Sequence, residues 1–362
     1  MEGGLYTEDL GTLGPEEGLV KLGGLVGGDE RLEESLAREI LIKRDVWIWG
    51  VDLSSNELSF EAVGRSQGLA KLRRGLISID LSNNRLDLIP RVVVSSLLNL
   101  KVLMLANNRI RDVIPFLSQL KSLEALDLSG NLLTSLPVEL SKLENLRTLS
   151  VCRNKLRSLP PQFTDLRKLE NLYLSGNDMG PSIPLVVYHM TSLKSLGLNR
   201  NYIDHVKPIV SQLENLQVLS LVYNSVEYLP LALFNCKNLQ RLNLSNNKLN
   251  SIPPDIEKLT ELEELYLDSN DLAVLPEEVG SLPKLKVLSV LENPQLIGIP
   301  AGLENLEELG FSGSMDKWKD ASNSGQLKRV WNRIAKHKED PDYVEIGTKT
   351  RGHMPSWFHG GR

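Results

Sequence analysis

The stretch Leu123–Leu133, LEALDLSGNLL, contains the pattern that decides the fold of this chain. Leucines stand eight, five and three residues before Asn131, and another leucine follows it by two. This frame recurs around eleven asparagines, which we call the ladder asparagines: Asn56, Asn84, Asn108, Asn131, Asn154, Asn177, Asn201, Asn224, Asn247, Asn270 and Asn293. After a first gap of 28 residues, their spacing is 23 or 24. A fixed period of this length predicts a solenoid whose repeats pack on their neighbours along one axis.

The first half of each repeat predicts a short strand followed by a turn. The LxxLxL alternation turns leucines toward the core on one face of the strand. The asparagine comes next, and its amide both donates and accepts hydrogen bonds. We therefore expect it to lie buried in the turn, where it pairs with main-chain groups that the strands leave unsatisfied. Stacked copies should form a polar ladder along the core.

The second half of most repeats predicts a short helical or irregular return. A proline stands six or seven residues after most ladder asparagines, as in Leu249–Leu259, LNSIPPDIEKL. It fixes the backbone as the chain leaves the turn and begins the return. Strands on one side and wider segments on the other bend a stack of repeats. The predicted fold is an α/β solenoid, a horseshoe with a parallel sheet on its concave face.

This pattern resembles the leucine-rich repeat signature over residues 48–314. The 23-residue LPxxLxxL form is similar to that of the Ras-group leucine-rich repeat proteins, which include the animal Ras-binding scaffolds and the plant intracellular Ras-group proteins. The resemblance implies an adaptor or regulatory role in small GTPase, phosphatase or kinase signalling. The Gly-Val-Tyr-Trp motif of the plant group is absent from this sequence.

Composition points to a cytoplasmic protein that does not bind nucleic acid. The 41 basic and 46 acidic residues give a net charge of −5, whereas phosphate binding relies on clustered lysine and arginine. No apolar run is long enough to span a membrane. The N-terminal residues lack the basic start and apolar stretch of a secretory signal. Two cysteines are too few for a disulfide framework, and we expect both Cys152 and Cys236 to be free thiols.

The chain divides into four predicted regions. Residues 1–28 contain nine glycines and are expected to form a flexible tail. Residues 29–45 carry Leu32, Leu36, Ile40 and Leu41 at helical spacing and predict an N-terminal cap helix. Residues 46–314 comprise the eleven repeats and one degenerate copy, and residues 315–362 form a basic, tryptophan-containing C-terminal region.

The C-terminal region contains a predicted amphipathic basic helix over residues 325–338, GQLKRVWNRIAKHK. Its apolar face either covers the last repeat as a cap, which we favour, or docks on a partner. If it docks, Trp331, Arg333 and Lys336 are the candidate contacts. The sequence pattern does not separate these alternatives.

No motif in the sequence predicts catalysis, a cofactor or a metal site. The glycines over residues 23–28 lack the lysine and the hydroxyl residue of a phosphate-binding loop. His-Glu-x-x-His and Cys-x-x-Cys are both absent. We therefore predict a protein that is not an enzyme and carries no cofactor.

The candidate binding surface is the concave face, which shows the residues six, four, two and one places before each ladder asparagine. The aspartates of the minus-four column, Asp52, Asp80 and Asp127, are attributed to solvation. Tyrosine and arginine, frequent at interface hot spots, gather in the middle repeats. The predicted protein-binding residues are Arg153, Asn171, Tyr173, Asn199, Arg200, Tyr223, Arg241, Tyr266 and Asp268, with Val222 and Glu264 beside them.

These observations predict an intracellular protein–protein interaction scaffold in signalling, with the partner on the concave face. A rigid, preorganised sheet loses little ordering entropy on binding. Two alternatives stay open: a structural or assembly subunit of a larger complex, and a regulatory subunit of a GTPase, phosphatase or kinase.

Overall fold

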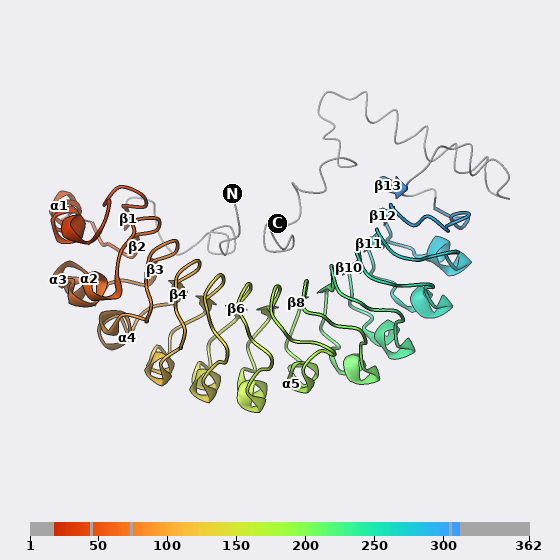
Figure 1. The fold of residues 1–362 in the computed structure, drawn as a ribbon, viewed down its shortest axis with the longest axis horizontal. Helices are drawn as coiled ribbons and strands as arrows, with labels where there is room; N and C mark the ends of the chain where they lie inside the picture. The colour runs from red at the N-terminus through yellow and green to blue at the C-terminus, as the bar shows by residue number, and fades with distance from the viewer. Residues whose placement is uncertain (1–17, 44–45, 73–74, 304–305, 312–362) are drawn as a thin grey trace, which may run out of the picture. The chain divides into compact units, whose positions relative to one another are not determined.

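The computed structural model describes residues 18–43, 46–72, 75–303 and 306–311. The chain forms two compact units, Met1–Asn177 and Asp178–Arg362, which we describe separately. In each unit, parallel strands lie along one side and helical segments along the other (Figure 1). The predicted solenoid with a parallel sheet is therefore confirmed.

The first unit contains one strand for each successive repeat. Neighbouring strands pair in parallel and in register, so that Leu126 faces Leu103 on one side and Leu149 on the other. The strands are β1 (Leu19–Lys21), β2 (Gly50–Asp52), β3 (Ser78–Asp80), β4 (Val102–Met104), β5 (Ala125–Asp127), β6 (Thr148–Ser150) and β7 (Asn171–Tyr173). The helical segments are η2 (Asp29–Arg31), α1 (Leu32–Ile42), α2 (Phe60–Arg65), α3 (Gln67–Lys71), α4 (Arg91–Ser96), η3 (Pro115–Gln119), η4 (Val138–Lys142) and η5 (Pro161–Asp165).

The second unit repeats the arrangement. Its strands are β8 (Ser195–Gly197), β9 (Val218–Ser220), β10 (Arg241–Asn243), β11 (Glu264–Tyr266), β12 (Val287–Val290) and β13 (Glu308–Phe311). Its helical segments are α5 (Leu185–Tyr188), η6 (Pro208–Gln212), η7 (Leu231–Asn235), η8 (Pro254–Lys258) and η9 (Glu277–Ser281). Strand β13 pairs with β12, which shows that the degenerate last copy still forms its strand.

The prolines begin the helical returns, as predicted. Pro137 and Pro253 hold extended backbone angles immediately before η4 and η8, and Pro208 is the first residue of η6. A proline at either place loses no helical hydrogen bond, because the first N–H groups of a helix have no partner within it.

The ladder asparagines join each repeat to the one before it. Asn131 Nδ2 donates to the carbonyl oxygen of Leu128 in its own repeat at 3.0 Å, and to that of Leu105 in the preceding repeat at 2.9 Å. Its Oδ1 accepts the N–H of Ile110, also in the preceding repeat, at 3.0 Å. Asn131 is 5 % exposed, so these groups have little water to bond to instead. The predicted polar ladder is confirmed.

The expectation of a flexible segment over residues 1–28 is wrong for its last part. Residues 18–28 form an incomplete repeat, in which β1 pairs with β2 and Val20 and Val26 are fully buried. Asn56 bonds to this segment as to a full repeat, since its Oδ1 accepts the N–H of Val26 at 2.7 Å. Leu25 occupies the place of a ladder asparagine, so a count based on asparagine passes over this copy.

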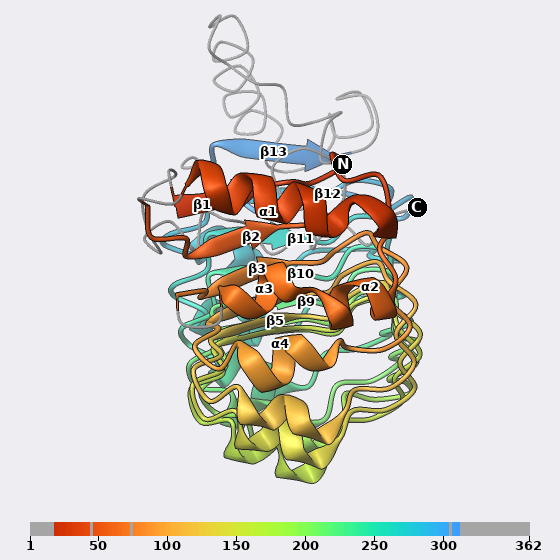
Figure 2. The ribbon, with the colours of Figure 1, turned by 90° about the vertical axis from the view of Figure 1, so that its left-hand side faces the viewer.

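Helix α1 is the return of this incomplete repeat, and it follows a strand rather than preceding the first one. It packs on α3, and Figure 2 shows the two helices on the same side of the unit. Leu32 and Leu36 are buried as predicted, whereas Leu41 is 69 % exposed. Gly68 permits the approach of α3, because a Cβ there would lie 3.0 Å from the Cβ of Leu36. Whether α1 acts as a cap stays a prediction.

The ladder can be tested within one repeat by comparing Asn247→Ala with Asn250→Ala. Asn247 Nδ2 donates to the carbonyl oxygens of Leu221 and Leu244, and its Oδ1 accepts the N–H of Val226. A buried group left unpaired costs about 1–3 kcal/mol, so Asn247→Ala should lower the free energy of unfolding by about 3 kcal/mol or more. Urea unfolding followed by circular dichroism measures this loss.

The matched control is Asn250→Ala, three residues away on the surface. It should change the free energy of unfolding by less than about 0.5 kcal/mol. Equal losses for the two variants would contradict the structural role of the ladder.

Candidate functional site

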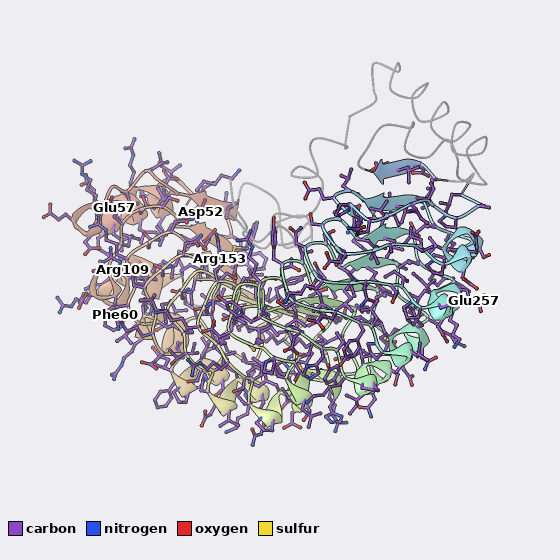
Figure 3. The ribbon with its side chains drawn as sticks, turned by 45° about the vertical axis from the view of Figure 1, so that its right-hand side comes forward. Asp52, Glu57, Phe60, Arg109, Arg153 and Glu257 are labelled. Carbon is purple, nitrogen blue, oxygen red and sulfur yellow. The ribbon has the colours of Figure 1, made fainter. Side chains whose placement is uncertain are left out.

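The strand face is the side of each sheet opposite the buried leucines. Leu172, Leu242 and Leu265 are fully buried at the centres of β7, β10 and β11. The flanking residues of each strand therefore point to the other side. Figure 3 shows Asp52 and Arg153 on the strand side of the first unit and Phe60 on its helical side.

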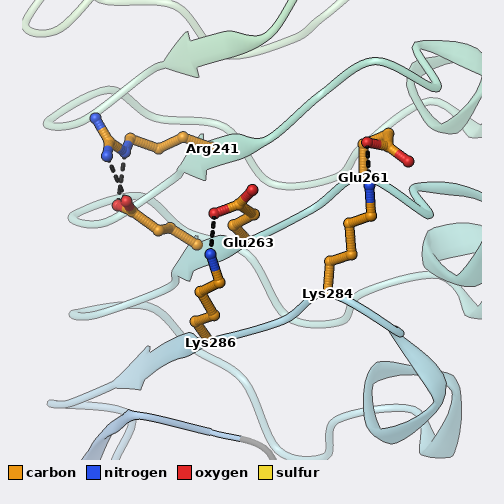
Figure 4. A network of polar contacts seen from close by, with 6 residues as sticks. Arg241, Glu261, Glu263, Lys284 and Lys286 are labelled. Carbon is orange, nitrogen blue, oxygen red and sulfur yellow. Dashed lines mark hydrogen bonds and ion pairs between the residues drawn. The ribbon is translucent and has the colours of Figure 1, made fainter.

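A polar group on this face joins β10 and β11. Arg241 Nε donates to Glu264 Oε2 at 2.6 Å, and Arg241 Nη2 bonds the other oxygen of the same carboxylate (Figure 4). The hydroxyl of Tyr266 donates to Glu264 Oε2 at 3.0 Å. A two-point arginine–carboxylate pair fixes the geometry as well as the charge. Of the residues predicted for the site, Arg241 and Tyr266 are therefore brought together, with Glu264 between them.

Burial and the Glu264 carboxylate together set the protonation states of Arg241 and Tyr266. Burial lowers the pKa of the Arg241 guanidinium, but the adjacent Glu264 carboxylate raises it by more, so Arg241 stays charged. Burial, and then the charge of Glu264, raise the pKa of Tyr266. Tyr266 is thus a neutral hydrogen-bond donor at physiological pH.

Two exposed ion pairs lie beside this group and contribute little to it. Lys286 Nζ lies 2.7 Å from Glu263 Oε2, and Lys284 Nζ lies 2.6 Å from Glu261 Oε2 (Figure 4). Each pair links neighbouring repeats on the solvent side. Exposed pairs of this kind contribute about 0–1 kcal/mol.

The predicted site residues Asn199 and Asp268 both bond to the turn of the following repeat. Asn199 is 1 % exposed, and its Oδ1 accepts hydrogen bonds from the Ser220 hydroxyl and the N–H of Val222 at 2.6 and 2.9 Å. Asp268 Oδ1 likewise accepts hydrogen bonds from the hydroxyl of Ser289 and from the N–H of Leu291. Both side chains sit two places before a ladder asparagine and bond to the following repeat.

The minus-four aspartates have a structural role that solvation alone does not describe. Asp52 accepts the N–H of Ser54 at 2.9 Å, Asp80 that of Ser82 at 2.8 Å, and Asp127 that of Ser129 at 2.9 Å. Each carboxylate thus satisfies a main-chain donor in its own turn. That these aspartates take no part in partner binding stays a prediction.

In the first unit, the predicted residues form a less open group. Tyr173 is 6 % exposed, so little of its ring is open to a partner, and Asn171 is half-buried, donating to Thr148 Oγ1 at 3.2 Å. Arg153 is half-buried, and its Nη2 donates to Asn107 Oδ1 at 3.2 Å.

The residue before every ladder asparagine has a positive φ between 52° and 71°. Glycine and asparagine adopt this left-handed conformation cheaply, and they fill five of the eleven places. A Cβ at Gly130 would lie 2.2 Å from Asn107 Oδ1, so a larger residue there would require the Asn107 side chain to move. Arg153, Arg200 and Tyr223 hold the same conformation with long side chains, at φ of 52°, 54° and 56°.

Arg200 and Tyr223 form a stacked pair at this position in two successive repeats. The guanidinium carbon of Arg200 lies 4.4 Å from the centre of the Tyr223 ring, within the range of a cation–π interaction. Tyr223 is 50 % exposed. Sequence reasoning missed Tyr202, which follows Asn201 directly, has φ of 60° and is 74 % exposed. The candidate positions were all placed before the ladder asparagine, so Tyr202, which comes after Asn201, was left out. Its aromatic side chain was the signal that could have identified it.

The remaining residues singled out in the sequence are three in the C-terminal region and the two cysteines. Trp331, Arg333 and Lys336 lie outside the described residues. Cys152 and Cys236 are buried free thiols, and burial raises the pKa of each to about 11. They are therefore protonated and poorly nucleophilic at neutral pH.

In the described part of the chain, no cluster of histidine, cysteine and acidic side chains could hold a metal ion. Among these same residues, no helix is long and apolar enough to cross a membrane.

Comparison with known proteins identifies the repeat. The family described as "Leucine-rich repeat region" matches residues 76–228, and "Leucine rich repeat" matches residues 214–272. The solved structure of a leucine-rich repeat protein from Leptospira interrogans is 31% identical, with a TM-score of 0.65, over 74% of this chain and 72% of that one. The Arabidopsis receptor kinase HAESA, solved in complex with the peptide hormone IDA and a co-receptor, is 28% identical, with a TM-score of 0.55, over 75% of this chain and 48% of that one.

A curated human relative matches over a shorter stretch. Leucine-rich repeats and immunoglobulin-like domains protein 3 is 40% identical over 91 residues, which is 25% of this chain. The match spans 8% of the length of that protein. The similarity therefore concerns the repeats.

A pH-dependent change in stability should follow from Asp268→Asn. Burial raises the pKa of Asp268 from its ordinary value of 3.8, although the bonds from Ser289 and Leu291 act in the opposite direction. Since the folded state holds this proton more tightly than the unfolded chain, the stabilisation is complete below pH 3.8 and is lost as the pH rises through the folded pKa. Asparagine has no charge to desolvate and accepts the same bonds, as Asn199 does.

We therefore expect Asp268→Asn to unfold at higher urea concentration than the wild type at pH 7, and the difference to disappear at pH 3. The reverse change, Asn199→Asp, places a charge in the same buried position and should destabilise the protein at pH 7. A wild-type protein more stable than Asp268→Asn at pH 7 would contradict the assignment.

Relief of backbone strain can be tested with Tyr202→Asn. Tyrosine in the left-handed conformation costs about 1 kcal/mol more than asparagine, so this variant should raise the free energy of unfolding by about 0.5–1 kcal/mol. Tyr228→Asn is the control, because Tyr228 is 61 % exposed and its φ is not positive. If thermal unfolding showed no increase in unfolding temperature for Tyr202→Asn relative to Tyr228→Asn, the proposed backbone strain at Tyr202 would be contradicted.

Proposed function

Because the chain belongs to the leucine-rich repeat family, we propose that it is a non-enzymatic interaction scaffold that binds a partner protein on its strand face. Proteins of this fold generally act through protein–protein interaction. The strands supply a regular array of side chains at fixed spacing, and the ladder holds their backbone rigid.

The observation that carries this proposal is the group formed by Arg241, Glu264 and Tyr266. These side chains are already bonded to one another across two strands before any partner binds. Binding to such a surface requires little ordering of side chains, which otherwise costs about 0.5–1.5 kcal/mol for each one immobilised. Arginine and tyrosine are also the residues found most often at interface hot spots.

The solved relatives support a protein or peptide as the ligand. HAESA was solved with a peptide hormone and a co-receptor, and its repeats are 28% identical to this chain. The signalling pathway of the present protein is a more specific proposal than protein binding. We infer a signalling role with a small GTPase, phosphatase or kinase as partner, on the repeat type alone.

Two further features favour an intracellular, non-catalytic protein. Cys152 and Cys236 are unpaired thiols, and such thiols persist in reducing compartments. Their raised pKa values also argue against a role as nucleophiles. We therefore propose a cytoplasmic location. The alternative, a subunit of a larger assembly, rests on the C-terminal region and predicts co-migration with a large particle.

The test exchanges the two charged residues of the pair, which keeps the ion pair but reverses the positions of its charges on the strand face. The double variant Arg241→Glu with Glu264→Arg retains a salt bridge between β10 and β11, so its thermal unfolding should stay close to that of the wild type. Partners that co-purify with the wild-type protein, quantified by mass spectrometry, should fall at least tenfold. A captured GTPase, kinase or phosphatase would support the regulatory role.

The matched control exchanges Asp255 and Lys258, which form an ion pair on η8, on the helical side. This exchange should leave capture unchanged. If the strand-face variant retained its partners and the η8 variant lost them, the binding surface would lie on the helical side.

A further inference from the structure

Two exposed tyrosines and an arginine lie in the loops that follow β8 and β9 of the second unit. We define the tyrosine rim as Arg200, Tyr202 and Tyr223. The rings of Tyr202 and Tyr223 are 74 % and 50 % exposed. The whole chain has eight tyrosines, so two exposed ones beside the ladder asparagines of successive repeats form a concentration that the repeat pattern does not require.

The rim is built at a cost in backbone energy. Arg200, Tyr202 and Tyr223 all have positive φ, at 54°, 60° and 56°. The neighbouring repeat fills the same place before its ladder asparagine with Asn246, which adopts this conformation more easily. Strained residues of this kind concentrate at functional sites. The fold alone would be more stable with glycine or asparagine at these positions.

Arg200 also differs from Arg241 and Arg85 in its electrostatic partners. Arg241 and Arg85 are each paired with a glutamate. Within the described residues, Arg200 forms no ion pair, and its buried Nε has no hydrogen-bond partner. Its contact with the Tyr223 ring holds the guanidinium in place without neutralising its charge. An oriented and uncompensated guanidinium is a site for a carboxylate.

The acidic residues of these loops stand at other positions of the repeat than Arg200. Asp204 and Glu227 each stand three places after a ladder asparagine, whereas Arg200 and Tyr223 stand one place before. Asp204 is moreover bonded to His205. The carboxylates therefore do not occupy the guanidinium of Arg200.

We propose that the tyrosine rim binds an acidic segment of a partner protein, with a carboxylate of the segment on Arg200 and its apolar residues on the tyrosine rings. The proposal rests on the proposed function in taking a protein as the ligand. Tyrosine rings supply large contact areas with little loss of side-chain freedom, and the charge of Arg200 selects the segment.

The experiment uses the full chain and three synthetic peptides that share Gly-Ser arms and differ at their centre: Leu-Glu-Leu, Leu-Gln-Leu and Leu-Lys-Leu. Binding is measured by fluorescence anisotropy at low salt. The Glu peptide should bind at least tenfold more tightly than the Gln peptide. Arg200→Met keeps the stem of the side chain but removes the charge, and it should reduce binding of the Glu peptide to the level of the Gln peptide.

Tyr202→Ala should weaken binding of the Glu peptide severalfold without lowering the unfolding temperature. Arg85→Met is the matched control, because Arg85 is exposed and already paired with Glu57, and it should change nothing. No preference for the Glu peptide, or equal binding by Arg200→Met, would overturn the proposal. So would displacement of the Glu peptide by an equimolar amount of inorganic phosphate, which would reassign the rim to a phosphorylated ligand.

This outcome is separable from that of the strand-face exchange. The Arg241→Glu, Glu264→Arg protein keeps every residue of the tyrosine rim, so it should bind the Glu peptide as the wild type does. Loss of the peptide in that variant would assign the acidic ligand to the strand face and remove it from the rim.

Discussion

The hydrogen bonds of the ladder asparagines constrain everything else in this protein. Each amide must reach a carbonyl oxygen in its own repeat and, in the preceding repeat, both a carbonyl oxygen and an N–H. These bonds are possible only when successive turns lie directly above one another. The period of the repeat, the in-register pairing of the strands and the alignment of side chains in columns all follow from that requirement. Because the groups are buried, a repeat that lost its amide would leave several of them unpaired.

The same turn also sets the conditions for the surface. It forces the residue before each ladder asparagine into the left-handed region, and it leaves main-chain donors that side chains such as Asp52, Asn199 and Asp268 satisfy. Polar residues near the turn are therefore of two kinds. Some stabilise the turn, and others, such as Arg200 and Tyr223, occupy it at a cost. Our proposal of a ligand site concerns residues of the second kind, because their long side chains add strain to the turn.

Much of the fold could be predicted from the sequence, because the repeats depend on local periodicity. The strands, the ladder and the proline-initiated returns follow from residues within one period. The incomplete repeat at residues 18–28 escaped prediction, because Leu25 replaces the asparagine that defined the count. Its strand is recognisable from its pairing with β2, which depends on residues about thirty positions away. Of the predicted site residues, Arg241 and Tyr266 lie together beside Glu264, whereas Asn199 is buried and bonds to the following repeat.

The sequence by itself determined the period, the direction in which each strand residue faces and the family to which the chain belongs. These properties follow from the spacing of residues, which is the same in eleven copies of the repeat. The tertiary structure alone decided which polar residues bond to a neighbouring repeat. Asp268 and Arg200 look equally available in the sequence, yet Asp268 accepts bonds from the next repeat, whereas Arg200 forms no ion pair among the residues that the structure describes. The physical reason is that hydrogen-bond partners come from neighbouring repeats, and their geometry exists only once the repeats are stacked.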